Sequence, residues 1–202
     1  MELAGRINGA LRRVPAWPVY VLGMAPAVWY FWLGLTGGLG PEPIKELEHR
    51  LGLAGLQFLI AGLAVTPLRR LTGVSLIRYR RAIGLVAFFY IALHLAVWLG
   101  LDLGSWKLIW ADILKRPYIT VGMAGFLLLV PLALTSSNAA VRRLGPVRWR
   151  RLHRLVYVAV PLGAIHFAML VKGVPVEPLA YLAAILALLA LRIRGSRQRL
   201  AA

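Results

Sequence analysis

The stretch that decides the fold is RRAIGLVAFFYIALHLAVWLG, which runs from Arg80 to Gly100. Its residues from Ala82 to Leu99 carry no charge at neutral pH, and their single imidazole belongs to His94. A helix that crosses a lipid bilayer needs ~17–25 mostly apolar residues, so this block is long enough to span one. An ionisable side chain within lipid is costly unless it has a partner, and His94 is therefore a candidate functional residue.

The whole chain has the composition of a membrane protein. It has 202 residues, 60% of them hydrophobic, and its mean hydropathy is +0.73. The apolar residues form unbroken blocks instead of alternating with polar ones, which indicates lipid as the solvent. Six blocks predict spanning helices, at 17–35, 51–68, 82–101, 118–135, 155–171 and 178–191. We therefore predict an all-α membrane protein, with residues 1–202 forming one six-helix transmembrane bundle.

The basic residues are distributed unevenly between the loops, and this predicts the topology. Of 24 Lys and Arg, 18 lie near the termini and in the stretches 69–81 and 142–154, whereas six lie in the alternate loops. Six of the seven acidic residues lie in those alternate loops, so the net charge of +17 belongs to one face. Cytoplasmic loops of membrane proteins carry the excess of Lys and Arg. We predict that both termini are cytoplasmic, and the charge needs no nucleic-acid partner.

The outer loops and the tryptophans predict contacts with the membrane surface. The stretch SWKLIWADILKRP, 105–117, has apolar residues at the spacing of one helix face, which predicts an amphipathic helix lying in the outer interface. Its polar residues Lys107, Asp112, Lys115 and Arg116 would remain for a partner, unless the helix is only a connector. The stretch PEPIKELEHR, 41–50, is expected to be a solvated loop that leaves His49 in solvent. An aromatic belt is expected from Trp17, Trp29, Trp32, Trp98, Trp106, Trp110 and Trp149.

A second histidine, His166, lies at the same predicted depth as His94. His94 comes 13 residues after Arg81 and His166 comes 12 residues after Arg154, which places them ~20 Å and ~18 Å into the bilayer. The chain has no cysteine, and no carboxylate is near either histidine in the sequence. Zinc would need four ligands, whereas two imidazoles at one level suit the axial positions of a haem iron.

The surroundings of His166 leave two questions open. Gly163 and Ala159, three and seven residues earlier, would make room for a flat macrocycle, but small residues also serve ordinary helix packing. His153 lies at the inner boundary, 13 residues before His166, and an ideal helix would not place both on one face. Pro161 could distort the helix and let His153 hold a second haem. The alternative is an interfacial histidine among arginines.

Longer stretches of the chain resemble a known family. The segments RRAIGLVAFFYIALH, DILKRPYITVGM and LTSSNAAVRRLGPVRWRRLHRLVYVAVPLGAIHF, with the six spans, are similar to the MsrQ (YedZ) family. That family comprises haem-binding membrane subunits of bacterial protein-methionine-sulfoxide reductases. More distantly the chain resembles the transmembrane domain of ferric reductases and NADPH oxidases, which places His94, His153 and His166 on haem-ligating positions. The resemblance implies one or two b-type haems, FMN, and the bacterial inner membrane.

The resemblance also implies a function. Electrons would pass from the quinone pool or a cytosolic flavin reductase to a periplasmic MsrP-type molybdoenzyme, whose own site reduces methionine sulfoxide. Two other functions remain open: a stand-alone ferric or quinone reductase that uses the same haem, and a non-redox transporter or scaffold. A proton-coupled transporter should carry acidic residues at several depths, and the six predicted spans are nearly free of them.

Overall fold

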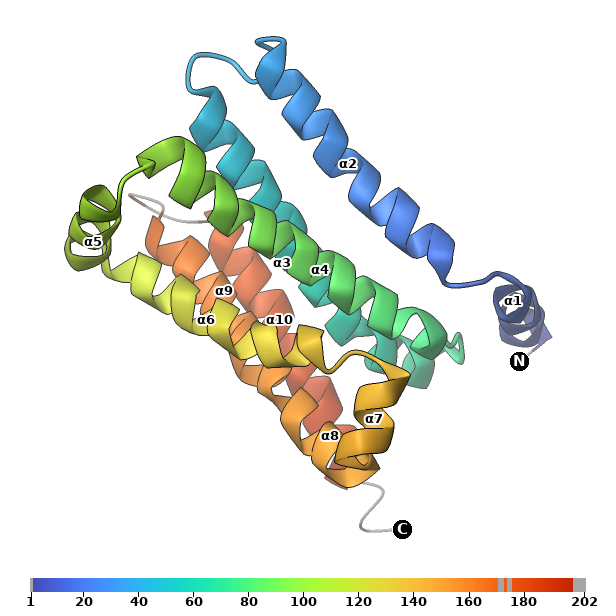
Figure 1. The fold of residues 1–202 in the computed structure, drawn as a ribbon. Helices are drawn as coiled ribbons and strands as arrows, with labels where there is room; N and C mark the ends of the chain where they lie inside the picture. Colours follow the sequence, from blue (N-terminus) through green and yellow to red (C-terminus); the bar gives the residue numbers. More distant parts are fainter. Residues whose placement is uncertain (1, 171–172, 174–175, 198–202) are drawn as a thin grey trace.

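The protein is a bundle of α-helices in which the long helices run side by side (Figure 1). The computed structural model describes residues 2–170, 173 and 176–197, and no β-strand occurs among them. The prediction of an all-α fold is confirmed. The helices are α1 (Glu2–Arg13), α2 (Trp17–Leu35), α3 (Pro43–Thr72), α4 (Arg80–Val97), α5 (Trp106–Lys115), α6 (Pro117–Leu134), α7 (Asn138–Leu144), α8 (Pro146–Leu152), α9 (Val156–Leu170) and α10 (Val176–Arg197). One π-helical segment, Trp98–Leu103, follows α4, and one 3₁₀ turn, His153–Leu155, separates α8 from α9.

Five helical stretches in the described part of the chain are long and apolar enough to cross a membrane. They are Trp17–Leu35, Pro43–Thr72, Ile77–Leu103, Pro117–Leu134 and Pro146–Leu170. The sixth predicted block, 178–191, lies within the 22 residues of α10. Figure 1 shows α1, α7 and α8 at one end of the bundle, here called the arginine-rich end, and α5 at the opposite end, called the α5 end.

The helix α3 begins earlier than the sequence suggested. The stretch 41–50 was expected to be a loop, but the structure is helical from Pro43 onward. A proline at the first helical position has its φ angle already set for a helix and needs no partner for the missing N–H. Two side-chain pairs on the first turns, Lys45 with Glu42 and Arg50 with Glu46, keep the charged residues satisfied. As a consequence, His49 lies on a helix and not in a loop.

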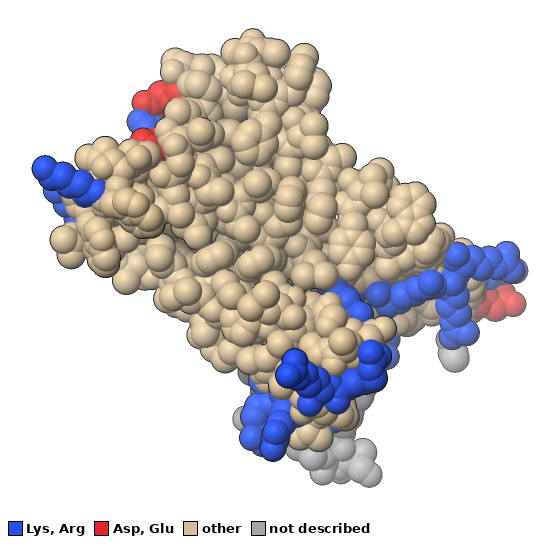
Figure 2. Space-filling view, viewed as in Figure 1, with Lys and Arg blue, Asp and Glu red and all other residues tan. Residues whose placement is uncertain are grey.

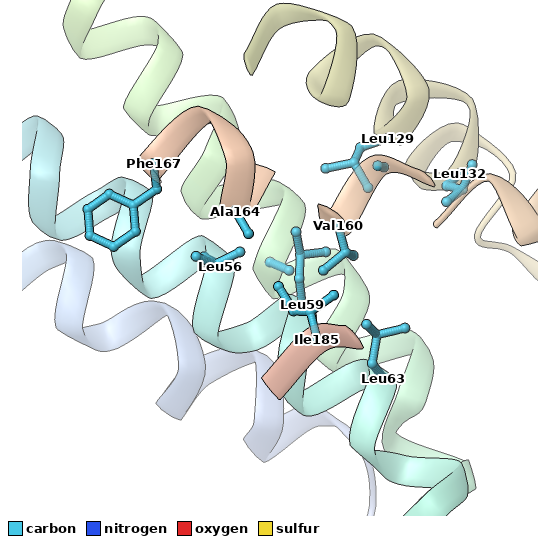
Figure 3. Packing of buried hydrophobic residues seen from close by; sticks show 11 residues of the cluster. Leu56, Leu59, Leu63, Leu129, Leu132, Val160, Ala164, Phe167 and Ile185 are labelled. Carbon is cyan, nitrogen blue, oxygen red and sulfur yellow. The ribbon is translucent and has the colours of Figure 1, made fainter. Parts of the chain in front are cut away.

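The core joins helices from both halves of the chain (Figure 3). In its main cluster α3 contributes Leu56, Leu59 and Leu63, and side chains from α6, α9 and α10 pack against them. These further residues are Leu129, Leu132, Val160, Ala164, Phe167 and Ile185. The helix α2 lies outside this cluster and is joined to α4 by a hydrogen bond: the buried hydroxyl of Tyr90 donates to the carbonyl of Gly23 at 2.8 Å. α3 and α4 form one closely packed pair, and α6 and α9 form another.

The surface between the two ends is apolar. In Figure 2 the charged side chains gather toward the two ends of the visible face, with uncharged residues between them. Many large apolar side chains are exposed, as expected for a surface in contact with lipid; Trp29 and Trp32 on α2, for example, are 53% and 50% exposed. Trp98 does not belong to this belt, because its side chain is buried and its Nε1 donates to Asp112. The belt prediction was therefore wrong for this tryptophan.

Candidate functional site

A cavity of about 350 Å³ lies between the α3/α4 pair and the α6/α9 pair. Most of its wall is apolar, with contributions from Leu56, Ile91, Phe126 and Leu129. Cavities of ~300–1,000 Å³ with apolar walls and a few polar groups are typical of cofactor and ligand sites. The polar groups here include three imidazoles, those of His49, His94 and His166.

Two of these imidazoles, on α4 and α9, lie next to each other. The ring centres of His94 and His166 are 6.2 Å apart, and the ring planes are at 78° to each other. The sequence predicted that these two residues share one depth, and the structure brings them together. Two imidazoles that bind one metal ion from opposite sides, each through a bond of ~2.0–2.1 Å, have their centres roughly 6 Å apart. The observed separation therefore suits one metal ion between the rings.

Each imidazole is oriented by a backbone carbonyl of the neighbouring helix. Nδ1 of His94 donates to the carbonyl of Glu48 at 2.9 Å, and Nδ1 of His166 donates to the carbonyl of Tyr118 at 2.7 Å. A carbonyl oxygen only accepts hydrogen bonds, so each Nδ1 carries the proton, and in the neutral ring Nε2 keeps its lone pair. Metal-binding histidines use this arrangement, in which the second ring nitrogen donates to a carbonyl or carboxylate.

Glycines make room for both rings. The residue four positions after each carbonyl is a glycine: Gly52 follows Glu48 and Gly122 follows Tyr118. A Cβ atom at Gly52 would lie 3.1 Å from Nδ1 of His94, and one at Gly122 would lie 2.7 Å from Nδ1 of His166. Any larger residue at either position would press on the imidazole, so the same carbonyl-and-glycine arrangement holds both rings.

The residues present fit a metal in a flat macrocycle better than a bare metal ion. No group of three or more His, Cys, Asp or Glu side chains able to hold a metal ion occurs among the described residues. Two axial imidazoles are sufficient when the remaining ligands come from a macrocycle, as in bis-histidine haem sites. Ala159 and Gly163 line the cavity together with His166, as expected if these small residues make room for a flat macrocycle. Ala159 also belongs to the main core cluster, so it serves ordinary helix packing as well.

His153 does not reach this cavity. Its ring stacks on Trp149 with centres 3.9 Å apart, in the 3₁₀ turn at the arginine-rich end. The hydroxyl of Thr135 donates to the carbonyl of Pro131 at 2.6 Å, so it accepts the 3.0 Å hydrogen bond from Nε2 of His153. That nitrogen is therefore already in use as a donor. Pro161 does not break the helix either, because α9 continues through it.

The end of the cavity nearest α5 is polar, and sequence reasoning missed it. Here the wall includes Lys45, Glu48, His49, Asp102 and Arg116, which are called the rim below. His49, expected in solvent, is half-buried, and its ring centre lies 5.6 Å from that of Phe167. The periodicity of His49, Gly52, Leu56 and Leu59 on α3 was the signal that could have identified this face.

The helix α5 forms as predicted, but its orientation differs from the expected one. Asp112 was expected to be available to a partner, whereas its side chain is buried and accepts from Trp98 Nε1 at 3.3 Å. Its other carboxylate oxygen pairs with Nε of Arg116 at 3.0 Å. Ile109 faces the protein, and Trp106, Trp110 and Leu114 point outward with at least 64% of their surface exposed. The hydrogen bond from Trp98, in the π-helical segment after α4, therefore helps to set the rotation of α5.

Comparisons with known proteins agree with this geometry. A family model described as the ferric reductase like transmembrane component matches residues 49–164. A Brucella anthropi protein is 53% identical over 178 residues, which cover 88% of this chain and 80% of that protein. An Agrobacterium fabrum protein is 51% identical over 181 residues, covering 88% and 82%. A Brucella ovis protein is 52% identical over 178 residues, covering 88% and 80%. All three bear the name protein-methionine-sulfoxide reductase heme-binding subunit MsrQ. No solved structure matches the chain.

Proposed function

The chain belongs to the MsrQ family of haem-binding subunits of protein-methionine-sulfoxide reductases, within the ferric reductase-like transmembrane proteins, and from this premise we propose that it carries electrons across the membrane through one b-type haem held by His94 and His166. The observation that carries the proposal is the pair of imidazoles 6.2 Å apart in an otherwise mostly apolar cavity. When bound, the haem supplies a one-electron redox centre. The protein orients the two ligands through the carbonyls of Glu48 and Tyr118 and surrounds the site with apolar side chains.

The proposed direction of electron flow follows from the distribution of charge. The loops at the arginine-rich end would face the cytoplasm under the positive-inside rule, which places both termini there and the α5 end in the periplasm. The cavity opens among residues next to α5, so its ligands lie toward the periplasmic side. This favours transfer to a periplasmic MsrP-type molybdoenzyme, in the inner membrane of a bacterium, with the reducing site for methionine sulfoxide on that partner.

The donor and the docking surface complete the proposal. Electrons would come from the quinone pool or from a cytosolic flavin reductase, and FMN is included because of the family resemblance alone. Lys107 and Lys115 on α5 are exposed and available to the periplasmic partner. Asp112 is not, because it is buried against Trp98. Exposed charges at a transient redox interface chiefly change the rate of encounter, and salt weakens their effect.

The experiment that tests this function measures haem and its reoxidation in the purified chain. The expected result is one low-spin b-type haem per chain, lost in both His94→Ala and His166→Ala but retained in His153→Ala. After anaerobic reduction, adding the periplasmic molybdoenzyme with methionine sulfoxide should reoxidise the haem. A colourless protein would reject the proposal, and so would haem that only ferric chelates or quinones reoxidise, since that result indicates a stand-alone reductase.

A further inference from the structure

The rim differs from the rest of the cavity because charged side chains gather there. Deeper in the cavity the wall is formed by aliphatic and aromatic residues, by glycine and by the imidazoles of His94 and His166, whereas the rim carries Lys45, Glu48, His49, Asp102 and Arg116. A flat macrocycle of the haem type has an apolar body and two ionised carboxylate side chains. Burying a carboxylate without a hydrogen-bonding partner is strongly unfavourable, so those carboxylates must lie where donors are available.

Arg116 is held in place at the rim by two bonds. Its Nε pairs with Oδ1 of the buried Asp112 at 3.0 Å, and its Nη1 donates to the hydroxyl of Tyr118 at 3.2 Å. The hydrogen bond to Tyr118 raises the pKa of the guanidinium above its ordinary value, so it stays charged. Its Nη2 makes no hydrogen bond to any residue that the structure describes. A fixed guanidinium with free donors is well suited to bind a carboxylate.

His49 is the second donor at the rim with no assigned role. It lines the cavity, its ring contacts that of Phe167, and neither ring nitrogen is hydrogen-bonded within the described residues. Lys45 lies one turn earlier on the same face of α3, with its Nζ 2.6 Å from Glu42. His49 is on α3 and Arg116 immediately precedes α6, so the two residues belong to opposite sides of the cavity. They provide one donor group for each of two carboxylates.

Two carboxylates also belong to the rim and oppose this binding. Glu48 and Asp102 line the cavity beside Lys45 and Arg116, so the acidic side chains offset the attraction of the cations and an anion depends on directed hydrogen bonds. Removing a rim carboxylate should therefore strengthen anion binding, whereas removing a donor should weaken it. This opposite sign separates the role of the rim from a general disturbance of the fold.

We infer that Arg116 and His49 bind the two carboxylates of the haem, with Asp112 as a positioning residue for Arg116. This inference rests on the proposed function, because it requires a haem between His94 and His166. A haem bound in this way would have its carboxylates at the rim, near the α5 end, and its apolar part among the apolar residues of the cavity wall. Lys45 is close enough in sequence and position to add a further cation at the same rim.

The experiment compares haem with its dimethyl ester, in which both carboxylates are neutral. Each is titrated into the purified haem-free chain in detergent, and the ratio of the two affinities is measured. We expect the wild type to bind haem at least tenfold more tightly than the ester. Arg116→Gln and His49→Leu should each reduce that ratio by about 10- to 100-fold, the usual effect of losing a charge-assisted hydrogen bond. Lys115→Gln, which changes an exposed neighbouring cation, should leave it unchanged, and Asp102→Asn should increase it.

The ratio distinguishes the possible failures. Equal affinity of the wild type for haem and for its ester would overturn the inference. So would variants whose affinities for haem and for the ester fall by the same factor. If the wild type binds neither compound, the proposed function itself fails. A low-spin spectrum retained in Arg116→Gln at saturating haem would show that His166 still binds the iron, so that the lost affinity belongs to the carboxylates.

Discussion

Replacing Gly122 by alanine should displace His166, one of the two proposed haem ligands, without changing any atom of its side chain. The added Cβ would lie 2.7 Å from Nδ1 of His166, 2.9 Å from its Cε1 and 3.0 Å from its Cγ. These distances are shorter than ordinary contact, and all three atoms belong to a ring that cannot bend away. The imidazole must therefore move as a unit, and its 2.7 Å hydrogen bond to the carbonyl of Tyr118 weakens.

The size of the effect follows from that displacement. Relief to an ordinary contact distance requires the ring of His166 to move by about 0.7 Å, more than the ~0.5 Å within which a binding group must be held. Disturbing the support of a metal-binding histidine typically lowers affinity ~10–100-fold, which corresponds to about 1.4–2.8 kcal/mol. Gly52→Ala should have a smaller effect, below about tenfold, because its Cβ would lie 3.1 Å from Nδ1 of His94.

The assay is the haem content of purified Gly122→Ala, Gly52→Ala and Gly84→Ala chains, followed by haem titration of each haem-free protein. Gly84 on α4 is the matched control, because a Cβ there meets nothing within 4 Å. We expect haem affinity to fall most for Gly122→Ala, less for Gly52→Ala and not at all for Gly84→Ala. Full affinity and an unchanged low-spin spectrum in Gly122→Ala would refute the reasoning, as would an equal loss in Gly84→Ala.

Three further changes test the fold around the site. Tyr90→Phe removes the hydroxyl that binds the Gly23 carbonyl and should destabilise the bundle by about 1 kcal/mol, measured as a lower thermal midpoint with unchanged haem content. Trp98→Phe removes the N–H that donates to Asp112 and should also lower the thermal midpoint, by about 2–4 °C. An Asp112 variant as stable as the wild type would contradict the importance of this buried hydrogen bond. A reporter that is active only in the periplasm should be inactive when fused to either terminus. Activity at either terminus would contradict the proposal that both are cytoplasmic.

That His94 and His166 lie close together could be predicted because the prediction needs only the rise of a helix and the positions of the arginines. A spanning helix has a fixed rise per residue, and the arginines mark where each span begins, so depth follows from counting along the chain. The unbroken apolar blocks likewise identify helices by length alone. Neither argument requires knowledge of side-chain contacts, and the structure contains the expected long helices and brings the two imidazoles together.

The rim and the orientation of α5 could not be predicted in the same way. His49 was assigned to a loop because its stretch is short and acidic, but Pro43 within that stretch starts the helix. Asp112 was assigned to the surface because the apolar stripe of α5 was expected to set its rotation. Its hydrogen-bond donor, Trp98, lies in the π-helical segment after α4, and spacing within α5 contains no information about that contact.

The two helix pairs hold the imidazoles independently, and this determines what sets the distance between them. His94 on α4 is bound by α3, and His166 on α9 is bound by α6, so each ring is oriented within its own pair. Their separation then depends on how one pair packs on the other. Leu56 of α3 lies 3.8 Å from the position of a Cβ at Gly163 of α9, and the same leucine belongs both to the cavity wall and to the main core cluster. The core therefore fixes the spacing of the two imidazoles, and if they bind haem as proposed, this lowers the cost of ordering them on binding.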